Sequence, residues 1–331
     1  SKKYSVGYLG VKKILDDKLA LNRIIDENDT IDISILNQYN LFVTGTSPSS
    51  NVEYNIWKYA SITGKKSICL LDSSKHLSYR FFKEELMGSP DLICVADNQV
   101  RDAVQDIVKD KNRIIVTGSP YFDSIKALKI SDIEKQNIRV EKGITDKKVI
   151  TFCTEYILKS GETERYGFDE ISVLDDLAQY IYQRGRNRFR LVIRIHPNDT
   201  VKIYEEYMKS TGSSIDWEII TDDTNRKMFQ ISDVVIGMTS LILIEAAIMG
   251  IASISYQPSK KIIEITEYKS MANIELASTK DKLFSLIDNT LFPLDLKKAE
   301  QHVYLYANSA EKIMDLIKSF LNSGRQISCQ I

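Results

Sequence analysis

Two short segments of the sequence constrain the fold most, because each reads as a buried strand that ends in a polar turn and leads into a helix. The first, LVIRIHPND at Leu191–Asp199, turns at a histidine-proline pair. The second, SDVVIGMTSLILIEAAIMGIASISYQ at Ser232–Gln257, turns at Thr239 and Ser240 before an apolar helix. In a parallel α/β sheet such strand ends face the same edge, where ligands bind. We therefore expect His196 and the Thr239-Ser240 turn to meet around one anionic, nucleotide-like ligand.

Apolar, strand-like runs recur along the rest of the chain and alternate with helical patterns. The expected strands are Leu41–Thr44, Ser67–Leu71, Asp91–Ala96, Arg113–Gly118, Val149–Cys153, Arg190–Ile195, Trp217–Ile220, Val234–Ile236 and Ala252–Tyr256. The expected helices are Val52–Thr63, Asn98–Val108, one opened by Ser119-Pro120, Ile171–Arg184, Val201–Thr211, Asn225–Gln230 and Leu241–Met249. Alternation at this spacing predicts parallel α/β sheets. Nearer the start the pattern is weaker, with a strand near Tyr4–Tyr8 and a helix across Val11–Ile25.

One polar and charged segment, Ile130–Asp146, interrupts the alternation and is the best candidate for a linker. At 331 residues the chain is long for one compact core, so two domains are expected. We therefore expect a Rossmann-like domain over residues 1–145 and a second Rossmann-like domain over residues 146–331. Apolar positions at helical spacing from Thr279 onward predict that the second half ends in a helical tail.

The composition excludes several classes of function. With 44 basic and 45 acidic residues the net charge is −1, so there is no electrostatic case for nucleic acid or an anionic membrane. The four cysteines are scattered without C-x-x-C spacing, which is typical of buried thiols in a reducing compartment. No apolar run approaches the roughly 18–20 residues of a membrane helix, and no secretory signal is visible. We expect a cytoplasmic protein.

The Thr239-Ser240 turn is the best candidate for an anion site. Two hydroxyls at a helix N-terminus add to free backbone N–H groups and to the positive end of the helix dipole, and this combination suits a phosphate. Glu245 lies one to two turns further along the same helix, where an acid can accept the hydroxyls of a ribose. The alternative for the hydroxyls is ordinary helix capping, the usual role of Ser and Thr there, and for Glu245 it is a surface or capping position.

The pair His196-Pro197 ends an apolar strand and is the second candidate. Proline stops the ladder of hydrogen bonds, which leaves the histidine at the carboxyl edge of the sheet, able to donate to a phosphate or a base. The chain has only three histidines. The alternative is a histidine that only satisfies local structure.

Three acids follow predicted strands and are the candidates for catalysis. Asp72 is the acid best placed to act as a base, Asp97 is second, and Glu155 is third. Helix capping or turn formation is the alternative for each. The Gly45–Ser50 turn is not a Walker A loop, because no lysine follows its glycine, and its sequence does not match G-x-G-x-x-G either. No D-x-D pair or histidine cluster supports a metal site, so none is expected.

These features together resemble the GT-B glycosyltransferase superfamily. They are two Rossmann halves, a histidine-proline turn in the second half, and S-D-V-V-I-G-x-T-S leading into an E-A-A-x-x-G helix. UDP-N-acetylglucosamine 2-epimerases share that architecture. The histidine-proline pair with a later hydroxyl pair is also similar to bacterial sialyltransferases and capsule Kdo transferases, which use CMP-activated sugars. The sequence lacks the D/E-D/E-G motif of sialyltransferases and a clear glycine loop after a first strand.

The resemblance implies a metal-independent glycosyltransferase of polysaccharide biosynthesis. Its donor would be a nucleotide sugar, CMP-linked in the sialyltransferase-like case, bound by His196, Pro197, Thr239 and Ser240 in the C-terminal half. Its acceptor would be a glycan or a lipid-linked saccharide, which would bring the protein to the inner face of the membrane. Asp72 would be the base, and no cofactor beyond the donor substrate is expected.

Two other interpretations stay open at this stage. A nucleotide-sugar 2-epimerase would need several acids near the sugar ring and basic groups around both phosphates. A protein of a different class, a non-catalytic Rossmann-like binding protein, would bind no nucleotide at all.

Overall fold

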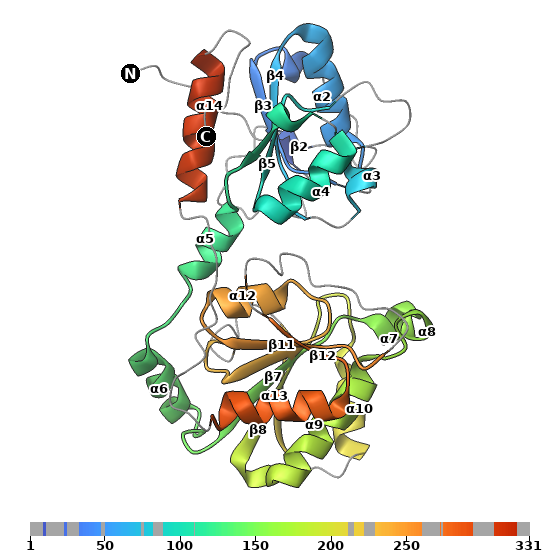
Figure 1. Ribbon diagram of the computed structural model, residues 1–331, viewed down its shortest axis with the longest axis vertical. Coiled ribbons are helices and arrows are strands. Elements are labelled where there is room, and N and C mark those ends of the chain that lie inside the picture. Colours follow the sequence, from blue (N-terminus) through green and yellow to red (C-terminus); the bar gives the residue numbers. More distant parts are fainter. Residues whose placement is uncertain are drawn as a thin grey trace. The chain divides into compact units, whose positions relative to one another are not determined.

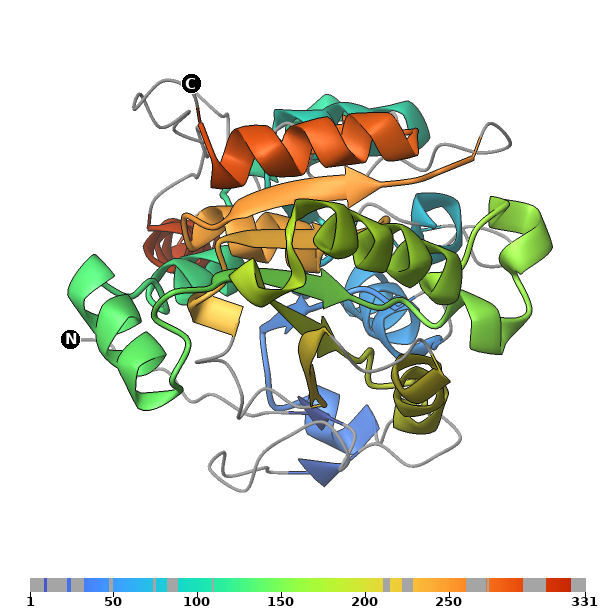
Figure 2. The same cartoon turned by 90° about the horizontal axis from the view of Figure 1, so that it is seen from below.

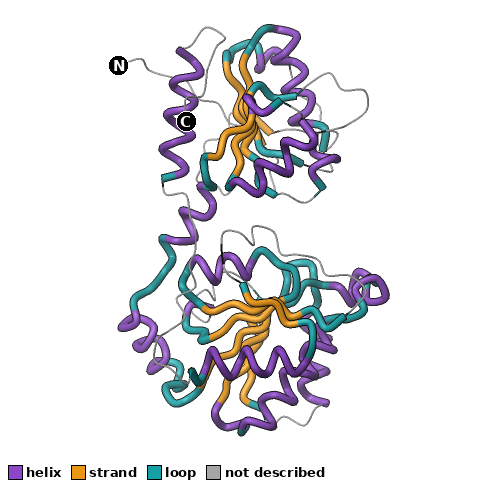
Figure 3. The backbone as a smooth tube through the Cα atoms, in the orientation of Figure 1, coloured by secondary structure: helices purple, strands orange, loops and turns teal. Residues whose placement is uncertain are grey.

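The protein, a computed structural model, divides into two compact units, each built on a parallel sheet with flanking helices (Figure 1). The first unit is Ser1–Ser119 with Asn308–Ile331, and the second is Pro120–Ala307. The structure describes residues 9–10, 23–24, 33–47, 50–73, 76–81, 89–108, 110–210, 215–221, 229–259, 272, 274–293 and 308–322. In both units the strands form the central layer, as the backbone trace shows (Figure 3).

The first unit contains a four-stranded sheet in the order β3-β4-β5-β6, all parallel. Its strands are β3 (Leu41–Thr44), β4 (Lys66–Leu70), β5 (Leu92–Val95) and β6 (Ile114–Val116). Its helices are α1 (Ile33–Leu36), α2 (Val52–Thr63), α3 (Leu77–Phe81), α4 (Asn98–Val108), the 3-10 turn η1 (Lys111–Arg113) and α14 (Ser309–Asn322). A separate pair of parallel strands is formed by β1 (Leu9–Gly10) and β2 (Arg23–Ile24).

Helices cover both faces of this sheet. On one face Ile56 and Ala60 of α2 pack against Phe42 of β3. On the other face Phe320 of α14 packs against Ile68 of β4, and this red helix stands beside the sheet in Figure 1. The last described helix of the chain therefore completes the core of the first unit.

The second unit contains a six-stranded parallel sheet in the order β12-β11-β10-β7-β8-β9. Its strands are β7 (Lys148–Cys153), β8 (Phe189–Arg194), β9 (Asp216–Ile220), β10 (Val234–Gly237), β11 (Ala252–Tyr256) and β12 (Glu275–Ala277). Its helices are α5 (Pro120–Lys126), α6 (Asp132–Glu141), α7 (Ile157–Ser160), α8 (Thr163–Tyr166), α9 (Glu170–Arg184), η2 (Arg186–Arg188), α10 (Val201–Ser210), α12 (Ile242–Ile248) and α13 (Lys280–Leu291).

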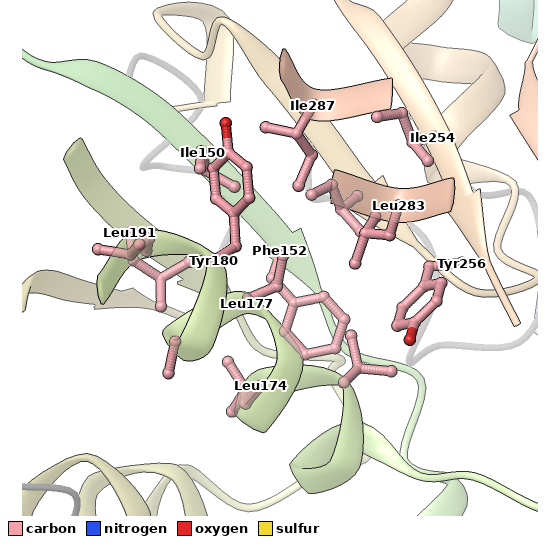
Figure 4. Close-up of a cluster of buried hydrophobic side chains, with 14 of the residues drawn as sticks. Ile150, Phe152, Leu174, Leu177, Tyr180, Leu191, Ile254, Tyr256, Leu283 and Ile287 are labelled. Atoms are coloured by element: carbon pink, nitrogen blue, oxygen red, sulfur yellow. The ribbon is translucent and has the colours of Figure 1, made fainter. Parts of the chain in front are cut away.

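Alternate residues of the central strands supply two cores. Ile150 and Phe152 of β7 face the larger core, where Leu177 of α9 and Leu283 of α13 meet them (Figure 4). These two helices run along the same face of the sheet (Figure 2), and Arg184 at the end of α9 is ion-paired with Asp288 of α13 at 2.7 Å. The residue that precedes Ile150 in the strand, Val149, faces a smaller core on the opposite side, to which α6 contributes.

Most expected elements are found within one or two residues of their predicted bounds. The strand Leu41–Thr44 and the helices Val52–Thr63 and Asn98–Val108 coincide with the prediction. Gly64 closes α2 in the left-handed conformation, with φ 69°. The expected strand near residues 4–8 and most of the expected helix 225–230 lie outside the described residues.

Four expectations differ from the structure. The segment Ile130–Asp146, expected to be a linker, contains α6, because Ser131 and Glu134 form a capping box and Arg139 donates to Ile231 O and Asp233. The units divide after Ser119 rather than after residue 145, and α14 joins the first unit instead of a C-terminal tail. Arg23–Ile24, expected at the end of a helix, forms β2. None of the described helices is both long and apolar enough to cross a membrane.

Candidate functional site

The chain changes direction in the second sheet between β7 and β10. It runs outward from β7 to β8 and β9, then returns to place β10 on the other side of β7. The order β9-β8-β7-β10-β11-β12 is the strand order 3-2-1-4-5-6 of the doubly wound fold, in which ligands bind outside the carboxyl ends of the strands where the order reverses. Glu155 follows β7 and Ser240 follows β10, so both lie at this switch point.

A cavity of about 230 Å³ opens beside the switch point, within the second unit. Its walls come from α5, from the ends of β8 and β9, and from the turn and helix that follow β10. The lining is apolar except for a small set of polar side chains: Tyr121, Arg194, His196, Gln230, Ser240 and Glu245. A mostly apolar concavity with few convergent polar groups is typical of a small-molecule site. His196 and Ser240 therefore meet at one cavity, as the sequence predicts.

The turn after β10 is held by a carboxylate from β7. The backbone N–H groups of Met238, Thr239 and Ser240 donate to Glu155 Oε1 at 2.9, 2.6 and 2.8 Å, and Thr239 Oγ1 donates to Oε2 at 2.5 Å. These backbone N–H groups and the Thr239 hydroxyl, which were predicted to bind a phosphate, are thus hydrogen-bonded to Glu155 instead. Thr239 is buried and bonded to this acid, and of the hydroxyl pair only Ser240 lines the cavity.

Gly237 allows this turn to form close to the sheet. A Cβ atom at Gly237 would lie 3.3 Å from both Cγ and Cδ2 of the buried Leu243 in α12. Contacts this close are tighter than ordinary packing, so with a larger residue here the Leu243 side chain would have to shift by a few tenths of an ångström.

His196 is held as a neutral imidazole. Its Nδ1 accepts the backbone N–H of Asn198 at 3.1 Å, which places the ring proton on Nε2. Burial lowers the pKa of His196 from 6.5; Asp199 opposes this change and Arg194 adds to it. The ring of Tyr156 lies beside the imidazole, with centroids 4.7 Å apart. His196 can therefore offer a fixed N–H donor to a ligand at neutral pH.

The free energy of unfolding is expected to fall as the pH is lowered, because the pKa of His196 is lower in the folded chain than in the unfolded chain. Below about pH 6.5 the unfolded chain binds a proton at His196 that the folded chain, with its lowered pKa, resists. The free energy of unfolding should therefore drop more steeply between about pH 7.5 and 5.5 in the wild type than in His196→Gln. Urea unfolding at each pH measures this, with the exposed His76→Gln as the control. Parallel profiles for the wild type and His196→Gln would contradict the expectation.

Arg194, the last residue of β8, and Glu245 of α12 bring opposite charges to the cavity. Both act on the buried Cys153 thiol, whose pKa burial raises to about 12; Arg194 lowers this pKa, while Glu245 and Glu155 raise it. Glu245 Oε1 also accepts the hydroxyl of Tyr121 at 2.6 Å. Sequence reasoning named Glu245 but missed Arg194 and Tyr121. The available signal for Arg194 was a charge between apolar residues in the interior of the run RLVIRI.

The exposed Pro197 also lines the cavity, directly after His196. The turn is closed by the backbone N–H of Asp199, which donates to His196 O at 2.8 Å, and it brings the N–H of Asn198 to the imidazole. The predicted ligand set is therefore brought together in part: His196, Pro197, Ser240 and Glu245 share the cavity, and Thr239 does not line it.

The two candidate catalytic acids of the first unit, Asp72 and Asp97, each have partners within the unit. Asp72 Oδ1 is bonded to Thr46 Oγ1 and, at 2.7 Å, to the guanidinium of the buried Arg80, while the side chain of Asp72 stays 61% exposed. Asp97 is buried and accepts the N–H of Val100 at 2.8 Å, which makes it the cap of α4. Asp97 therefore caps a helix, which was the alternative to a catalytic role. The carboxylate of Asp72 keeps the exposure that a base requires.

Comparison with known proteins supports these features at the level of the fold. No protein-family model matches the chain, and no curated protein matches its sequence. The chain is similar to the MnaA structure with UDP from S. aureus, with 17% identity, a TM-score of 0.61 and coverage of 90% of this chain and 80% of that one. It is also similar to the UDP-GlcNAc 2-epimerase from Neisseria meningitidis bound to UDP-GlcNAc, with 14% identity, a TM-score of 0.61 and coverage of 86% of this chain and 78% of that one.

A third similar structure is HepE from Anabaena in complex with UDP, with 11% identity, a TM-score of 0.57 and coverage of 87% and 80%. At these identities the likeness shows the fold. The predicted architecture, an α/β chain of two Rossmann-like domains of the GT-B type, is confirmed.

Proposed function

We propose that the chain is a glycosyltransferase whose nucleotide-sugar donor binds in the cavity of the second unit. The observation that carries the proposal is the convergence of Arg194, His196, Ser240 and Glu245 on one cavity at the switch point of a doubly wound sheet. The similar structures with bound UDP or UDP-GlcNAc support the choice of a nucleotide sugar.

Each polar group suits one part of such a donor. The guanidinium of Arg194 supplies positive charge to a phosphate, and the Nε2–H of His196 supplies a neutral donor. The Ser240 hydroxyl adds a second donor, and the Glu245 carboxylate can accept ribose hydroxyls. The cavity of about 230 Å³ is smaller than the roughly 300–1,000 Å³ of sites that enclose a whole ligand, so it fits the phosphate and ribose portion.

In the proposed reaction an acceptor hydroxyl attacks the anomeric carbon, the bond from that carbon to the donor phosphate breaks, and the nucleotide leaves. Arg194 and His196 stabilise the charge that develops on the leaving phosphate, as fixed donors do in other active sites. Asp72 remains the proposed base that takes the proton from the acceptor. The acceptor is a glycan or a lipid-linked saccharide, and no metal ion takes part in this proposal.

The epimerase interpretation differs in the groups it needs. Among the described residues that line the cavity, one guanidinium and one carboxylate are present, Arg194 and Glu245. Elimination and readdition of a nucleoside diphosphate needs several acids near the sugar and basic groups around both phosphates. The single guanidinium of this described lining, near the phosphate portion, favours transfer, whereas the sugar ring would lie beyond this cavity. Inversion of a UDP-sugar without any acceptor would instead support epimerisation.

A thermal-shift screen against UDP, CMP, GDP and ADP tests the proposal. One of the pyrimidine nucleotides is expected to raise the melting temperature, because a ligand at about a hundred times its dissociation constant stabilises the native state by about 2.7 kcal/mol. The choice between UDP and CMP separates a diphosphate donor from a CMP-linked one. If none of the four changes the melting temperature, a non-catalytic binding protein becomes the better interpretation.

A further inference from the structure

Glu170 is an acid buried without exposure at the first position of α9. Its carboxylate accepts three backbone N–H groups from the loop after β7 and the start of α7, from Ile157 at 2.6 Å, Leu158 at 3.0 Å and Glu155 at 3.3 Å. Burying a carboxylate is costly unless hydrogen bonds satisfy it, and the N-terminus of α9 adds a favourable dipole. The carboxylate of Glu170 thus fixes one short stretch of backbone.

That stretch contacts the walls of the cavity at three consecutive residues. Thr154 Oγ1 accepts the backbone N–H of His196 at 2.9 Å. Glu155 accepts the N–H of Ser240 at 2.8 Å. Tyr156 places its ring beside the imidazole of His196. One loop therefore sets the positions of two proposed ligand-binding residues that lie 44 positions apart in the sequence (196 and 240).

The loop adopts a conformation that needs support. Tyr156 has φ 59°, in the left-handed region that residues other than glycine rarely adopt. Such residues persist only where the surrounding structure holds them. The bonds from Glu170 flank Tyr156 on both sides, at Glu155 and at Ile157.

We propose that Glu170 is a positioning residue for the donor cavity. It fixes the loop after β7, and through Glu155 and Thr154 this loop sets the Ser240 hydroxyl and the His196 imidazole. Glu170 is buried behind the loop and is not among the residues that line the cavity. The inference rests on the proposed function for the identity of the ligand. The effect of Glu170 on the Met238–Ser240 turn can be measured without any ligand.

The test uses Glu170→Gln in the full chain, with two measurements. The dissociation constant for the nucleotide found in the screen should rise about five- to tenfold, in the range that residues without ligand contact achieve. Hydrogen exchange of the amides of Met238, Thr239 and Ser240 should accelerate relative to the amides of the central strand β7. If Glu170→Gln does not fold, Glu170→Asp, which keeps the charge and shortens its reach, serves the same test.

The matched control is Asp288→Asn. Asp288 also anchors α9, but at its far end, through Arg184 and Tyr180. It is expected to lower the melting temperature while leaving nucleotide affinity and exchange at residues 238–240 within about twofold of the wild type. Equal effects of Glu170→Gln and Asp288→Asn on affinity and exchange would overturn the proposal, since Glu170 would then act only on stability. If the wild type binds no nucleotide, the proposed function fails, and exchange at residues 238–240 alone supports or overturns the link.

Discussion

Replacement of Glu155 by alanine is expected to lower the free energy of unfolding of the second unit by about 3 kcal/mol and to weaken nucleotide binding strongly. The carboxylate accepts three backbone N–H groups and the Thr239 hydroxyl, and the methyl group of alanine can accept none. Met238 and Thr239 are buried, so water cannot readily replace the lost oxygens. The turn that carries Ser240 would then lose its anchor to β7.

The two tryptophans allow this stability to be measured for one unit. Trp217 lies in β9 of the second unit and Trp57 in α2 of the first. With Trp57 replaced by phenylalanine in every variant, fluorescence during urea unfolding reports the second unit through Trp217. Glu155→Gln keeps one acceptor oxygen and should be less destabilising than Glu155→Ala. Glu162→Ala, an exposed acid on the same connection, should stay within about 0.5 kcal/mol of its parent.

This experiment also decides what Glu155 does. A base or nucleophile would be needed for turnover but not for stability. If Glu155→Ala unfolds like its parent and binds nucleotide normally, yet loses turnover, then Glu155 is catalytic and does not anchor the Met238–Ser240 turn.

Replacement of Arg194 by methionine is expected to weaken nucleotide binding about 30-fold, equivalent to about 2 kcal/mol, which is typical for a hydrogen bond to a charged group. Methionine fills similar space but carries no charge, so the loss reports the guanidinium at the phosphate. Calorimetric titration of the nucleotide measures the change. The loss should be larger for a nucleotide than for its nucleoside, because only the nucleotide carries the phosphate.

Arg190→Met is the matched control for Arg194→Met. Arg190 lies on the same strand near its other end, where its guanidinium binds Asp216 and Glu218 rather than the cavity. It is expected to change nucleotide affinity by less than about twofold. Equal losses of affinity in the two variants would show that β8 as a whole, and not the cavity, had been disturbed.

Strands and connecting helices could be predicted because their signal is local. Apolar runs such as Leu41–Thr44 and helical spacing such as Val52–Thr63 are properties of neighbouring residues. The carboxyl edge of a parallel sheet then brings His196 and Ser240 to one cavity. What could not be predicted depends on contacts distant in sequence, such as the packing of α14 in the first unit.

The candidate site shows the same division. That Thr239 and Ser240 offer donors to an anion follows from the helix N-terminus. That the anion is Glu155, 84 positions earlier than Thr239, follows only from the pairing of β7 with β10. Arg194 was missed because a charge at the end of an apolar run does not reveal on which side of the sheet its side chain lies. The capping role of Asp97 was one of two open alternatives, and its bond to Val100 selects it.

The central claim is that the cavity of the second unit binds the donor nucleotide, and a crystal structure with the nucleotide identified in the screen tests it most directly. The predicted result has a phosphate within hydrogen-bonding distance of Arg194 and His196 Nε2, a ribose hydroxyl at Glu245, and Glu155 still bonded to the Met238–Ser240 turn. A nucleotide bound elsewhere on the chain, with this cavity empty, would contradict the claim.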